Sequence, residues 1–446
     1  MDFSAIKSAV VSAAEKAGIK EYELYYVSDA GVSTETLKHE ISNFSSSVSG
    51  GVCFRCVVDG KMGYASSELM DVDEIEALVT RAANNAKYVE SEDDGIIFAG
   101  SKEYGRINAP EPKILEAAEL KAMALEIEKE LYGASDKVID GSQAAVGSSE
   151  MWVRIFNSYG LDLENHVGRN YAMAYGVVNV DGEVRNDYEV KVGNTKADFE
   201  GMAKKTVEAA LEQIGAGDVE TGVYNVVINK SQMASLLSAY SSIFSAKSAQ
   251  NGMSLLVGKE GEVIASECVT ITDDPFREGY ALQTHFDAEG VATYRKSVVE
   301  NGVFKTFLHN LSTAKKAGVE TTGNASKAGY AGSVAVSPYC FCLEGSDMTE
   351  DELFAKAGNG IYVTGVKGLH AGINAVTGDY SIECSGFTIE DGKKAKPVKS
   401  FTIAGNFFEL LKNIDAVANE VKIGIGGFTA FGAPSVLVHG ISVAGK

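Results

Sequence analysis

Apolar residues recur at every third or fourth position in four stretches of the first half of the chain, and this spacing predicts helices with one buried face. Helix-ending and helix-starting residues support two of them, since Gly18 closes the first and Asp71 opens the second. Pro112 is expected at the start of the third helix and Gly133 at its end. The four stretches are residues 3–18, 71–86, 112–133 and 199–215.

Short runs rich in Val, Ile, Tyr and Phe lie between these helices and predict β-strands. The runs occur in clusters joined by short polar turns, whereas consecutive parallel strands need a long crossover between them. We therefore expect antiparallel pairing and an α+β fold, in which helices form a layer on the antiparallel sheet of the first half. The expected strands are Tyr22–Val27, Val52–Val58, a strand from Val138 onward, Met151–Asn157, Ala172–Val180 and Tyr188–Val192.

A change in composition near the middle of the chain predicts a domain boundary. Residues 215–222 are rich in turn-forming residues and poor in apolar ones. We expect an N-terminal α+β domain over residues 1–217 and a β-rich C-terminal domain over residues 222–446.

The second half opens with an expected strand and helix and then becomes mostly β in character. Asn301-Gly302 and Asp391-Gly392 each separate two strand-like runs, and such pairs tolerate the positive φ that a tight hairpin turn requires. The second half is therefore expected to contain hairpins. Its expected strand is residues 223–228, and its expected helices are residues 233–244 and 407–414.

The charge of the chain argues against one class of partner. There are 40 Lys and Arg residues against 61 Asp and Glu residues, which gives a formal net charge of −21. Nucleic-acid binding draws much of its free energy from cations that neutralise phosphates, and an acidic surface repels them. We therefore expect no direct contact with nucleic acid.

The sequence also shows no targeting signal. The N-terminus lacks a basic segment followed by an apolar one, and no stretch approaches the roughly 20 apolar residues that cross a bilayer. We expect a cytoplasmic protein that keeps away from the membrane and holds its six cysteines reduced.

Two short patterns could suggest a metal site. Cys53 and Cys56 have CxxC spacing, but they lie in an alternating strand-like run without the second Cys or His pair that zinc normally needs. We interpret them as small packing residues. His39-Glu40 begins like the zinc helix of a metalloprotease, but Asn43 stands where the second histidine would be. We interpret this pair as two polar strand residues.

Several common catalytic patterns are missing. The sequence has no G-x-S-x-G elbow, no P-loop and no G-x-G-x-x-G after a strand, which argues against the commonest hydrolase and nucleotide-binding classes. Gly424-Ile-Gly426-Gly427 is rich in glycine but lacks the lysine of a phosphate-binding loop. We expect it to form a bend or a close backbone approach.

The densest group of polar residues is the segment GLHAGINAVTGDY, which starts at Gly368. It combines an imidazole, an amide and a carboxylate with glycines that permit close backbone approach. Such a loop could orient a peptide through main-chain hydrogen bonds, or it could be a glycine-rich turn with a satisfied histidine. The candidates for a peptide-binding cleft are His370, Gly372, Asn374, Gly378 and Asp379.

Several segments resemble the TldD/PmbA family, many of whose members carry the name modulator of DNA gyrase. In the second half the resemblance rests on LLSAYSSIFSAKSAQNGMSLLVGKEGEVIAS, VTITDDP, GLHAGINAVTGDYS, FTIAGNFFELLKNI and SVLVHGISVAG. In the first half GVCFRCVVDGKMGYASS and RIFNSYGLDL agree more weakly. The segments keep the family's order and span nearly the whole chain.

The resemblance implies a place in one of two branches. TldD-like members carry a helical HExxxH zinc motif just before the segment that corresponds to GKEGEVIAS, and a cysteine ligand near the C-terminus. PmbA-like members, also called TldE, lack both. The matching helix here, Leu236–Phe244, contains neither His nor Glu, and no cysteine follows Cys384. A catalytic zinc normally needs three protein ligands, so the resemblance implies a PmbA/TldE-like chain without metal ligands or catalytic residues.

The function that the resemblance implies is that of a non-catalytic subunit of a TldD/TldE-type zinc metalloprotease, which cleaves unfolded peptides in peptide maturation and antitoxin degradation. Zinc is expected in a TldD-like partner that forms a heterodimer with this chain, while the chain alone could form a homodimer. The implied C-terminal domain has a large curved, barrel-like antiparallel sheet, which could bind an extended peptide by strand addition.

Two other functions stay open. One is an independent hydrolase whose site is assembled from distant segments and uses His370 and Asp379. The other is a homodimeric peptide-binding module without a protease partner.

Overall fold

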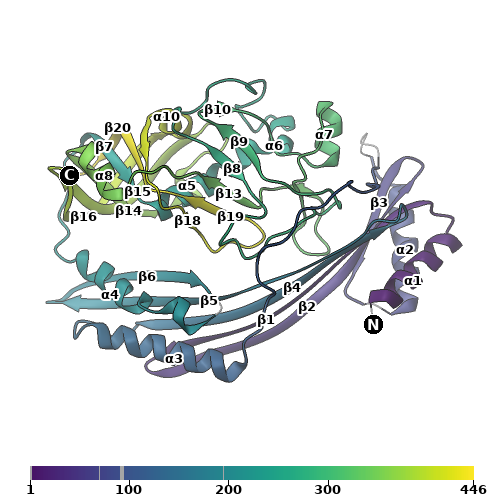
Figure 1. Ribbon diagram of the computed structural model, residues 1–446, viewed down its shortest axis with the longest axis horizontal. Helices are drawn as coiled ribbons and strands as arrows, with labels where there is room; N and C mark the ends of the chain where they lie inside the picture. Colours follow the sequence, from purple (N-terminus) through teal and green to yellow (C-terminus); the bar gives the residue numbers. More distant parts are fainter. Residues whose placement is uncertain (1–2, 70, 91–94, 194) are drawn as a thin grey trace.

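A long curved antiparallel sheet forms the first half of the computed structural model, which describes residues 3–69, 71–90, 95–193 and 195–446. Its strand order is β3-β2-β1-β4-β5-β6. The sheet curves past the second half of the chain, as Figure 1 shows. Its strands are β1 (Glu21–Leu37), β2 (Glu40–Val58), β3 (Lys61–Ser67), β4 (Gln143–Asn157), β5 (Asp162–Val180) and β6 (Glu183–Val192).

Tight turns and the alternation of buried and less buried residues along the strands explain how this sheet forms. Asp59-Gly60 and Asp181-Gly182 link neighbouring strands, and all four residues have positive φ.

Five of the predicted strands lie within β1, β2, β4, β5 and β6 but are shorter than these strands. In β2 the reason is that residues 40–49 are mostly exposed and carry little apolar signal. The strand predicted from Val138 begins only at Gln143, as the first part of β4, and Val138 itself makes an isolated bridge to Val178. His39 lies in the turn between β1 and β2 with a φ of 65°, so its assignment to a strand was wrong.

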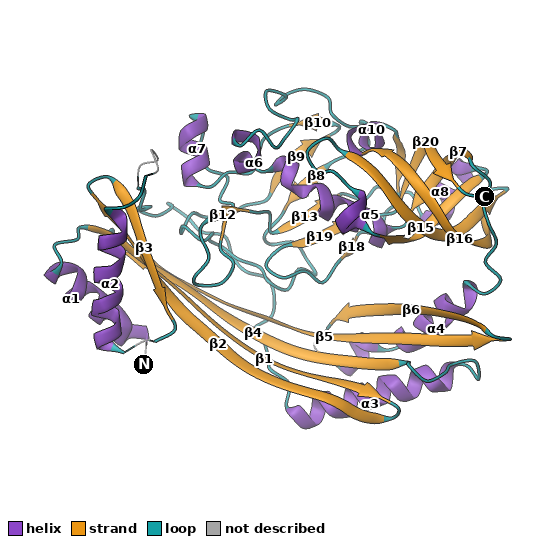
Figure 2. Ribbon diagram, turned by 180° about the vertical axis from the view of Figure 1, so that it is seen from behind, coloured by secondary structure: helices purple, strands orange, loops and turns teal. Residues whose placement is uncertain are grey.

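Both faces of the curved sheet are covered at the end where β3 pairs with β2. Leu24 and Phe54 pack against the helices of the first half, whereas Tyr25 and Cys53 pack against segments of the second half. This division follows from the two-residue period of a strand, which sends successive side chains to opposite faces. Helices α3 and α4 lie on the face turned away from the second half (Figure 2).

The four predicted helices of the first half are present. The third begins at Ala117 and not at Pro112, because the segment before it is tied to the sheet: the Leu115 amide donates to Ser148 Oγ at 3.0 Å. The fourth begins at Met202, while Phe199 ends a separate 3₁₀ turn. The helices are α1 (Phe3–Lys16), α2 (Val72–Ala86), α3 (Ala117–Ala134) and α4 (Met202–Glu212), and the 3₁₀ turn is Lys196–Phe199.

A five-stranded closed barrel forms the end of the second half. Its order is β16-β15-β14-β7-β20, and pairing of β20 with β16, from Thr402 opposite Ala444, closes it. The pair β7–β14 is parallel and the other pairs of the barrel are antiparallel. The strands are β7 (Gly222–Ile228), β14 (Gly360–Lys367), β15 (Asp379–Glu390), β16 (Lys393–Asn406) and β20 (Val436–Ala444), with β17 (Ile414–Val417) beside β20.

A second six-stranded sheet, of order β10-β9-β8-β13-β19-β18, packs beside the barrel. The turns Asn301-Gly302 and Asp391-Gly392 have the positive φ that was predicted. The strands of this sheet are β8 (Ile271–Asp273), β9 (Lys296–Glu300), β10 (Val303–Phe304), β13 (Cys340–Leu343), β18 (Lys422–Ile423) and β19 (Ala430–Ala433), and β11 (Ala325–Ser326) pairs with β12 (Ala335–Val336).

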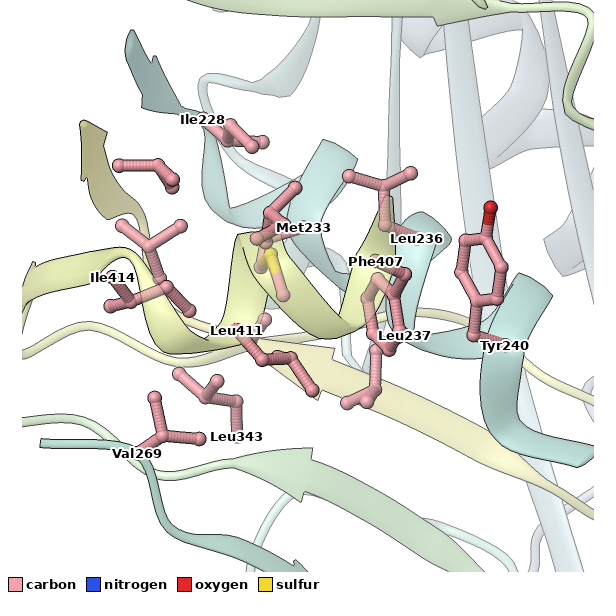
Figure 3. Close-up of a cluster of buried hydrophobic side chains, with 14 of the residues drawn as sticks. Ile228, Met233, Leu236, Leu237, Tyr240, Val269, Leu343, Phe407, Leu411 and Ile414 are labelled. Carbon is pink, nitrogen blue, oxygen red and sulfur yellow. The ribbon is translucent and has the colours of Figure 1, made fainter. Parts of the chain in front are cut away.

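The largest apolar core lies between the barrel and the helices of the second half. Met233, Leu237 and Tyr240 of α5 are buried there, and the Tyr240 ring stacks on Phe407 with centroids 4.3 Å apart (Figure 3). The predicted helix 233–244 is the end of α5 followed by a 3₁₀ turn, Ser241–Phe244. The helices are α5 (Lys230–Tyr240), α6 (Ala246–Gln250), α7 (Leu311–Ala317), α8 (Glu350–Ala357), α9 (Leu369–Gly372) and α10 (Phe407–Lys412).

These observations confirm the α+β class with curved and barrel-like antiparallel sheets. The longest curved sheet belongs to the first half, and the second half contains the closed barrel. The segment predicted as the domain boundary, residues 215–222, lies between the end of α4 and the start of β7.

A buried ion cluster joins the two halves of the chain. Arg55 of β2 donates from Nε and Nη2 to Glu23 Oε1 of β1, at 2.9 and 2.6 Å. Its Nη1 lies 3.6 Å from Glu289 Oε1, which belongs to the second half. The three side chains are at most 8% exposed. Burial lowers the pKa of Arg55, but Glu23 and Glu289 outweigh this effect and the pKa is raised, so the guanidinium stays charged.

We expect Arg55→Ala to lower the free energy of unfolding by about 3–5 kcal/mol, because it leaves two buried carboxylates without their cation. Urea unfolding of the full chain would measure the change. The control Arg81→Ala removes a partly exposed partner of Glu74 and should cost less than about 1 kcal/mol. Replacing the whole cluster, as Glu23→Gln, Arg55→Met and Glu289→Gln together, should cost less than Arg55→Ala. Equal losses for the two arginine variants would contradict this role of Arg55.

Candidate functional site

The predicted segment 368–380 forms a loop at the start of β15. Gly368, with a φ of 76°, precedes the single helical turn α9, and Asp379 begins β15. The loop lies against α5, since Leu369 packs on the apolar core and Tyr240 Oη donates to the carbonyl of Asp379 at 2.9 Å. The candidate loop and the helix expected to mark the zinc-bearing branch are therefore neighbours.

The side chain of Asn374 shapes this loop. Its Oδ1 accepts hydrogen bonds from the amides of Val376 and Thr377, at 3.0 and 3.2 Å. The backbone amide of Asn374 donates to the carbonyl of Asp379 at 2.8 Å. The carbonyl of Asn374 accepts from Gly378 at 2.9 Å. Asn374 thus closes a turn, which is a common role for this residue.

The carboxylate of Asp379 is held by two neighbours. Asn406 Nδ2 donates to Oδ1 at 3.0 Å and Thr377 Oγ1 donates to Oδ2 at 2.8 Å. Hydrogen bonds from Asn406 and Thr377 lower the pKa of Asp379. The group is therefore ionised at neutral pH and is a weaker base than an ordinary aspartate.

The two candidate glycines allow the chain to approach itself. A Cβ on Gly372 would lie 2.4 Å from the carbonyl oxygen of Ser381. Gly378 has a φ of 86°, and a Cβ there would lie 2.7 Å from the ring of Phe408. Close packing within the chain therefore requires glycine at both positions, independently of any ligand.

His370 differs from the other four candidates. It lies on α9 with its side chain exposed, and within the described residues it has no hydrogen-bond, ion-pair or ring partner. The loop thus brings Asn374, Gly378 and Asp379 together and leaves the imidazole at the surface. Their place in a peptide-binding cleft stays a prediction.

Helix α5 offers hydroxyl and apolar groups beside this loop. Ser235 Oγ donates to the carbonyl of Ser231 at 2.9 Å, and after the helix Ser241 Oγ donates to Ser238 at 2.8 Å. Leu236 and Leu237 are fully buried (Figure 3). Among the described residues, no three His, Cys, Asp or Glu side chains lie together as metal ligands would.

Cys53 and Cys56 do not form a joint site. They lie three residues apart on β2, so their side chains point to opposite faces of the sheet, Cys53 toward the second half and Cys56 toward α1 and α2. Both are buried, and burial raises the pKa of Cys56 to about 11. Two buried thiols that point to opposite faces of the sheet are packing residues.

Residue patterns missed a cleft of about 640 Å³ between the two halves of the chain. Its walls include β6 of the curved sheet, β18 with the following loop, and residues 278–282. These segments lie far apart in the sequence, so no local pattern connects them. The one available signal was the glycine run from Gly424 to Gly427, part of which lines the cleft.

Comparison with protein families matches nearly the whole chain. Three models agree in order: PmbA/TldA metallopeptidase domain 1 over residues 22–86, the central domain over residues 110–214 and the C-terminal domain over residues 221–445. The chain belongs to the PmbA/TldD metallopeptidase family.

Similar proteins carry the same family names. The metalloprotease PmbA homologue of Haemophilus influenzae is 27% identical over 93% of this chain and 91% of its own length. Metalloprotease PmbA of Escherichia coli O157:H7 is 24% identical over 94% and 92%. These names support a role in a family of peptidases.

Solved structures share the fold over its full length. A Thermotoga maritima protein, described as a candidate modulator of a DNA gyrase, has a TM-score of 0.90 and 29% identity, covering 99% of this chain and 100% of its own. TldE of Thermococcus kodakarensis has a TM-score of 0.88 at 22% identity, with the same coverage. No helix in the described part of this chain is long and apolar enough to cross a bilayer.

We expect Gly378→Ala to destabilise the chain by about 1–3 kcal/mol, because the new methyl group meets Phe408 and the backbone has left-handed φ. Urea unfolding would measure this loss. The matched control is Gly133→Ala in α3, where a Cβ meets nothing within 4 Å, and it should be neutral or gain up to about 1 kcal/mol. Wild-type stability of Gly378→Ala would contradict the packing role of this glycine.

Proposed function

We propose that this chain is the non-catalytic, PmbA/TldE-like subunit of a TldD/TldE-type zinc metalloprotease that cleaves unfolded peptides. The observation that carries the proposal is the composition of α5 and the turn after it. At the position that matches the HExxxH helix of TldD-like members, the chain has Ser, Ala, Leu and Tyr in place of histidine and glutamate. Hydroxyl and aliphatic groups do not replace the imidazoles that bind a catalytic zinc.

The C-terminal segment supports the same proposal. The strands β19 and β20 carry no cysteine, and the last cysteine, Cys384, is buried on β15. Burial raises the pKa of Cys384 to about 12, which disfavours the thiolate that a zinc ligand must supply. The zinc and the general base would therefore come from a TldD-like partner.

The proposed assembly is a heterodimer that encloses unfolded peptides, in peptide maturation or antitoxin degradation. A homodimer could occupy the same surface when the partner is absent. The net charge of −21 favours peptides and proteins over nucleic acid as partners. The cytoplasm, where thiols stay reduced, is the proposed location.

The independent-hydrolase alternative would place His370 and Asp379 in one catalytic group. The contacts of Asp379 argue against this, because its two oxygens accept from Asn406 and Thr377 and not from an imidazole. In a catalytic pair the carboxylate orients the histidine base through a hydrogen bond, and the His370 side chain has no such partner among the described residues.

Reconstitution tests the proposal. The purified chain should bind less than one zinc per chain and cleave no unfolded peptide, and adding an HExxxH-bearing family member should produce cleavage. Metal analysis and a casein-peptide assay would measure both, with co-purification reporting the heterodimer. Tight zinc binding and peptide cleavage by the chain alone would overturn the proposal.

Two variants locate the chemistry within the assembly. Replacing the glutamate of the partner's HExxxH motif by glutamine should abolish cleavage, because it removes the general base. His370→Ala in this chain should leave the turnover rate within about twofold, since a non-catalytic imidazole takes no proton in the reaction. A loss of 100-fold or more with His370→Ala would favour the hydrolase alternative.

A further inference from the structure

The cleft between the two halves has polar walls from segments distant in the sequence. On one side lie residues 189–192 of β6, and on the other lie β18 and the glycine-containing loop that follows it. Figures 1 and 2 both place β18 beside β5 and β6 across the junction of the halves. The cleft volume of about 640 Å³ falls in the range of ligand-binding sites.

Two sheet edges face this cleft. β6 is the last strand of the curved sheet and pairs with β5 alone among the described strands. β18 is the last strand of the second sheet and pairs with β19 alone among them. An edge strand presents unpaired amides and carbonyls, which an added strand can satisfy.

The loop after β18 exposes main chain to the cleft. The amide of Gly424 donates to the carbonyl of Phe431 at 2.9 Å, which fixes the start of the loop. A Cβ on Gly426 would lie 1.8 Å from the carbonyl oxygen of Thr429, so glycine there lets the loop fold back closely on itself. Gly424 and Gly426 line the cleft with main-chain atoms, beside the side chains of Lys422 and Ile425.

Positive charge is concentrated in the cleft although the chain as a whole is acidic. Two lysines are paired: Lys230 lies 2.6 Å from Glu420, and Lys422 lies 3.4 Å from Glu189. The remaining lining charges are one carboxylate and three cations, namely Glu278, Arg169, Lys191 and Lys205.

None of the three remaining cations forms an ion pair within 4 Å of a carboxylate among the described residues, although Arg169 interacts electrostatically with Asp29. Lys191 Nζ donates to the carbonyls of Asp198 and Glu200, at 3.4 and 3.2 Å. Arg169 donates to the carbonyl of Gly426. Lys205 of α4 is exposed, and its side chain has no partner among the described residues. The cleft thus has an excess of positive charge that an anionic ligand would neutralise.

We propose that this cleft binds acidic peptide segments in an extended conformation, as a strand added to the free edge of β6. Backbone hydrogen bonds provide affinity, and Arg169, Lys191 and Lys205 favour Glu and Asp side chains. The inference rests on the proposed function, since it assigns this subunit a share in selecting the peptides that its partner cleaves. Lysines on an edge strand also prevent aggregation, and that role alone would give no preference for acidic peptides.

Fluorescence anisotropy with the full-length chain alone tests the binding. The probes are a labelled ten-residue peptide of alternating Glu and Val and its counterpart of alternating Gln and Val. The Glu peptide should bind at least about tenfold more tightly at low salt, and the difference should shrink as salt rises. Equal affinity for the two peptides would overturn the charge preference.

Backbone pairing is tested with the same Glu peptide carrying N-methyl groups on alternate amides. One of the two alternating sets should reduce binding at least about tenfold, because those amides pair with the strand edge. Full affinity for both methylated peptides would overturn strand addition.

Charge-reversed variants locate the site. Lys191→Glu with Lys205→Glu should weaken binding of the Glu peptide at least about tenfold. The matched control is Lys204→Glu on the same helix, which lies outside the cleft and loses only an exposed pair with Glu208. It should change binding less than about twofold. Equal effects of the control and the double variant would overturn the assignment of this cleft.

The outcome is separable from the proposed function. Zinc-dependent cleavage by the reconstituted pair, together with no acidic preference of this chain, would reject the cleft assignment and keep the subunit role. Acidic-peptide binding by a chain that forms no active pair would reject the subunit role.

Discussion

The buried contact of Arg55 with Glu23 and Glu289 determines how the two halves of the chain meet. Moving these charges out of water costs several kcal/mol, and the cost is recovered only if the partners come together in one arrangement. Glu23 and Arg55 lie on neighbouring strands whose register places them opposite each other, whereas Glu289 comes from the second half. The cluster therefore favours one position of the second half on the curved sheet. Nearby contacts agree, because Lys327 Nζ lies 4.8 Å from the centre of the Tyr25 ring.

This fixed junction explains why a cleft exists. The curved sheet packs closely on the second half around Tyr25, Val153 and Phe286. Farther along the sheet, beyond that apolar contact, β6 and β18 face an open space. Two edge strands would invite aggregation if they were flat and apolar. Here lysines lie on both edges, and each edge ends within a cleft that a single peptide could fill.

Local patterns predicted the elements with strong periodicity and missed what depends on distant contacts. The apolar start of β1, the apolar end of β2, the helices of the first half and the Asp-Gly and Asn-Gly turns follow from short-range rules, and the structure confirms them. The polar outer part of β2 carries little apolar alternation, and the start of α3 is shifted by a hydrogen bond from Leu115 to Ser148. The cleft could not be predicted, because residues near 190, 280 and 423 meet only after folding. The sequence did identify the polar loop 368–380. Its composition does not reveal that the side chains of Asn374 and Asp379 form hydrogen bonds with other groups of the chain.

Helix α5 is held in the fold mainly by apolar contacts. Met233 and Leu237 are buried, and Tyr240 combines a ring stack on Phe407 with a hydrogen bond to Asp379. These contacts anchor α5 to the barrel core by apolar burial and packing, which hold a helix whatever its exposed face carries. A catalytic metal at that face would add chemistry and would not be needed for folding, unlike a structural zinc. A helix of this kind without metal ligands would therefore leave the barrel, the loop and the cleft intact, and these are the parts that the proposed subunit would use to bind a partner and a peptide.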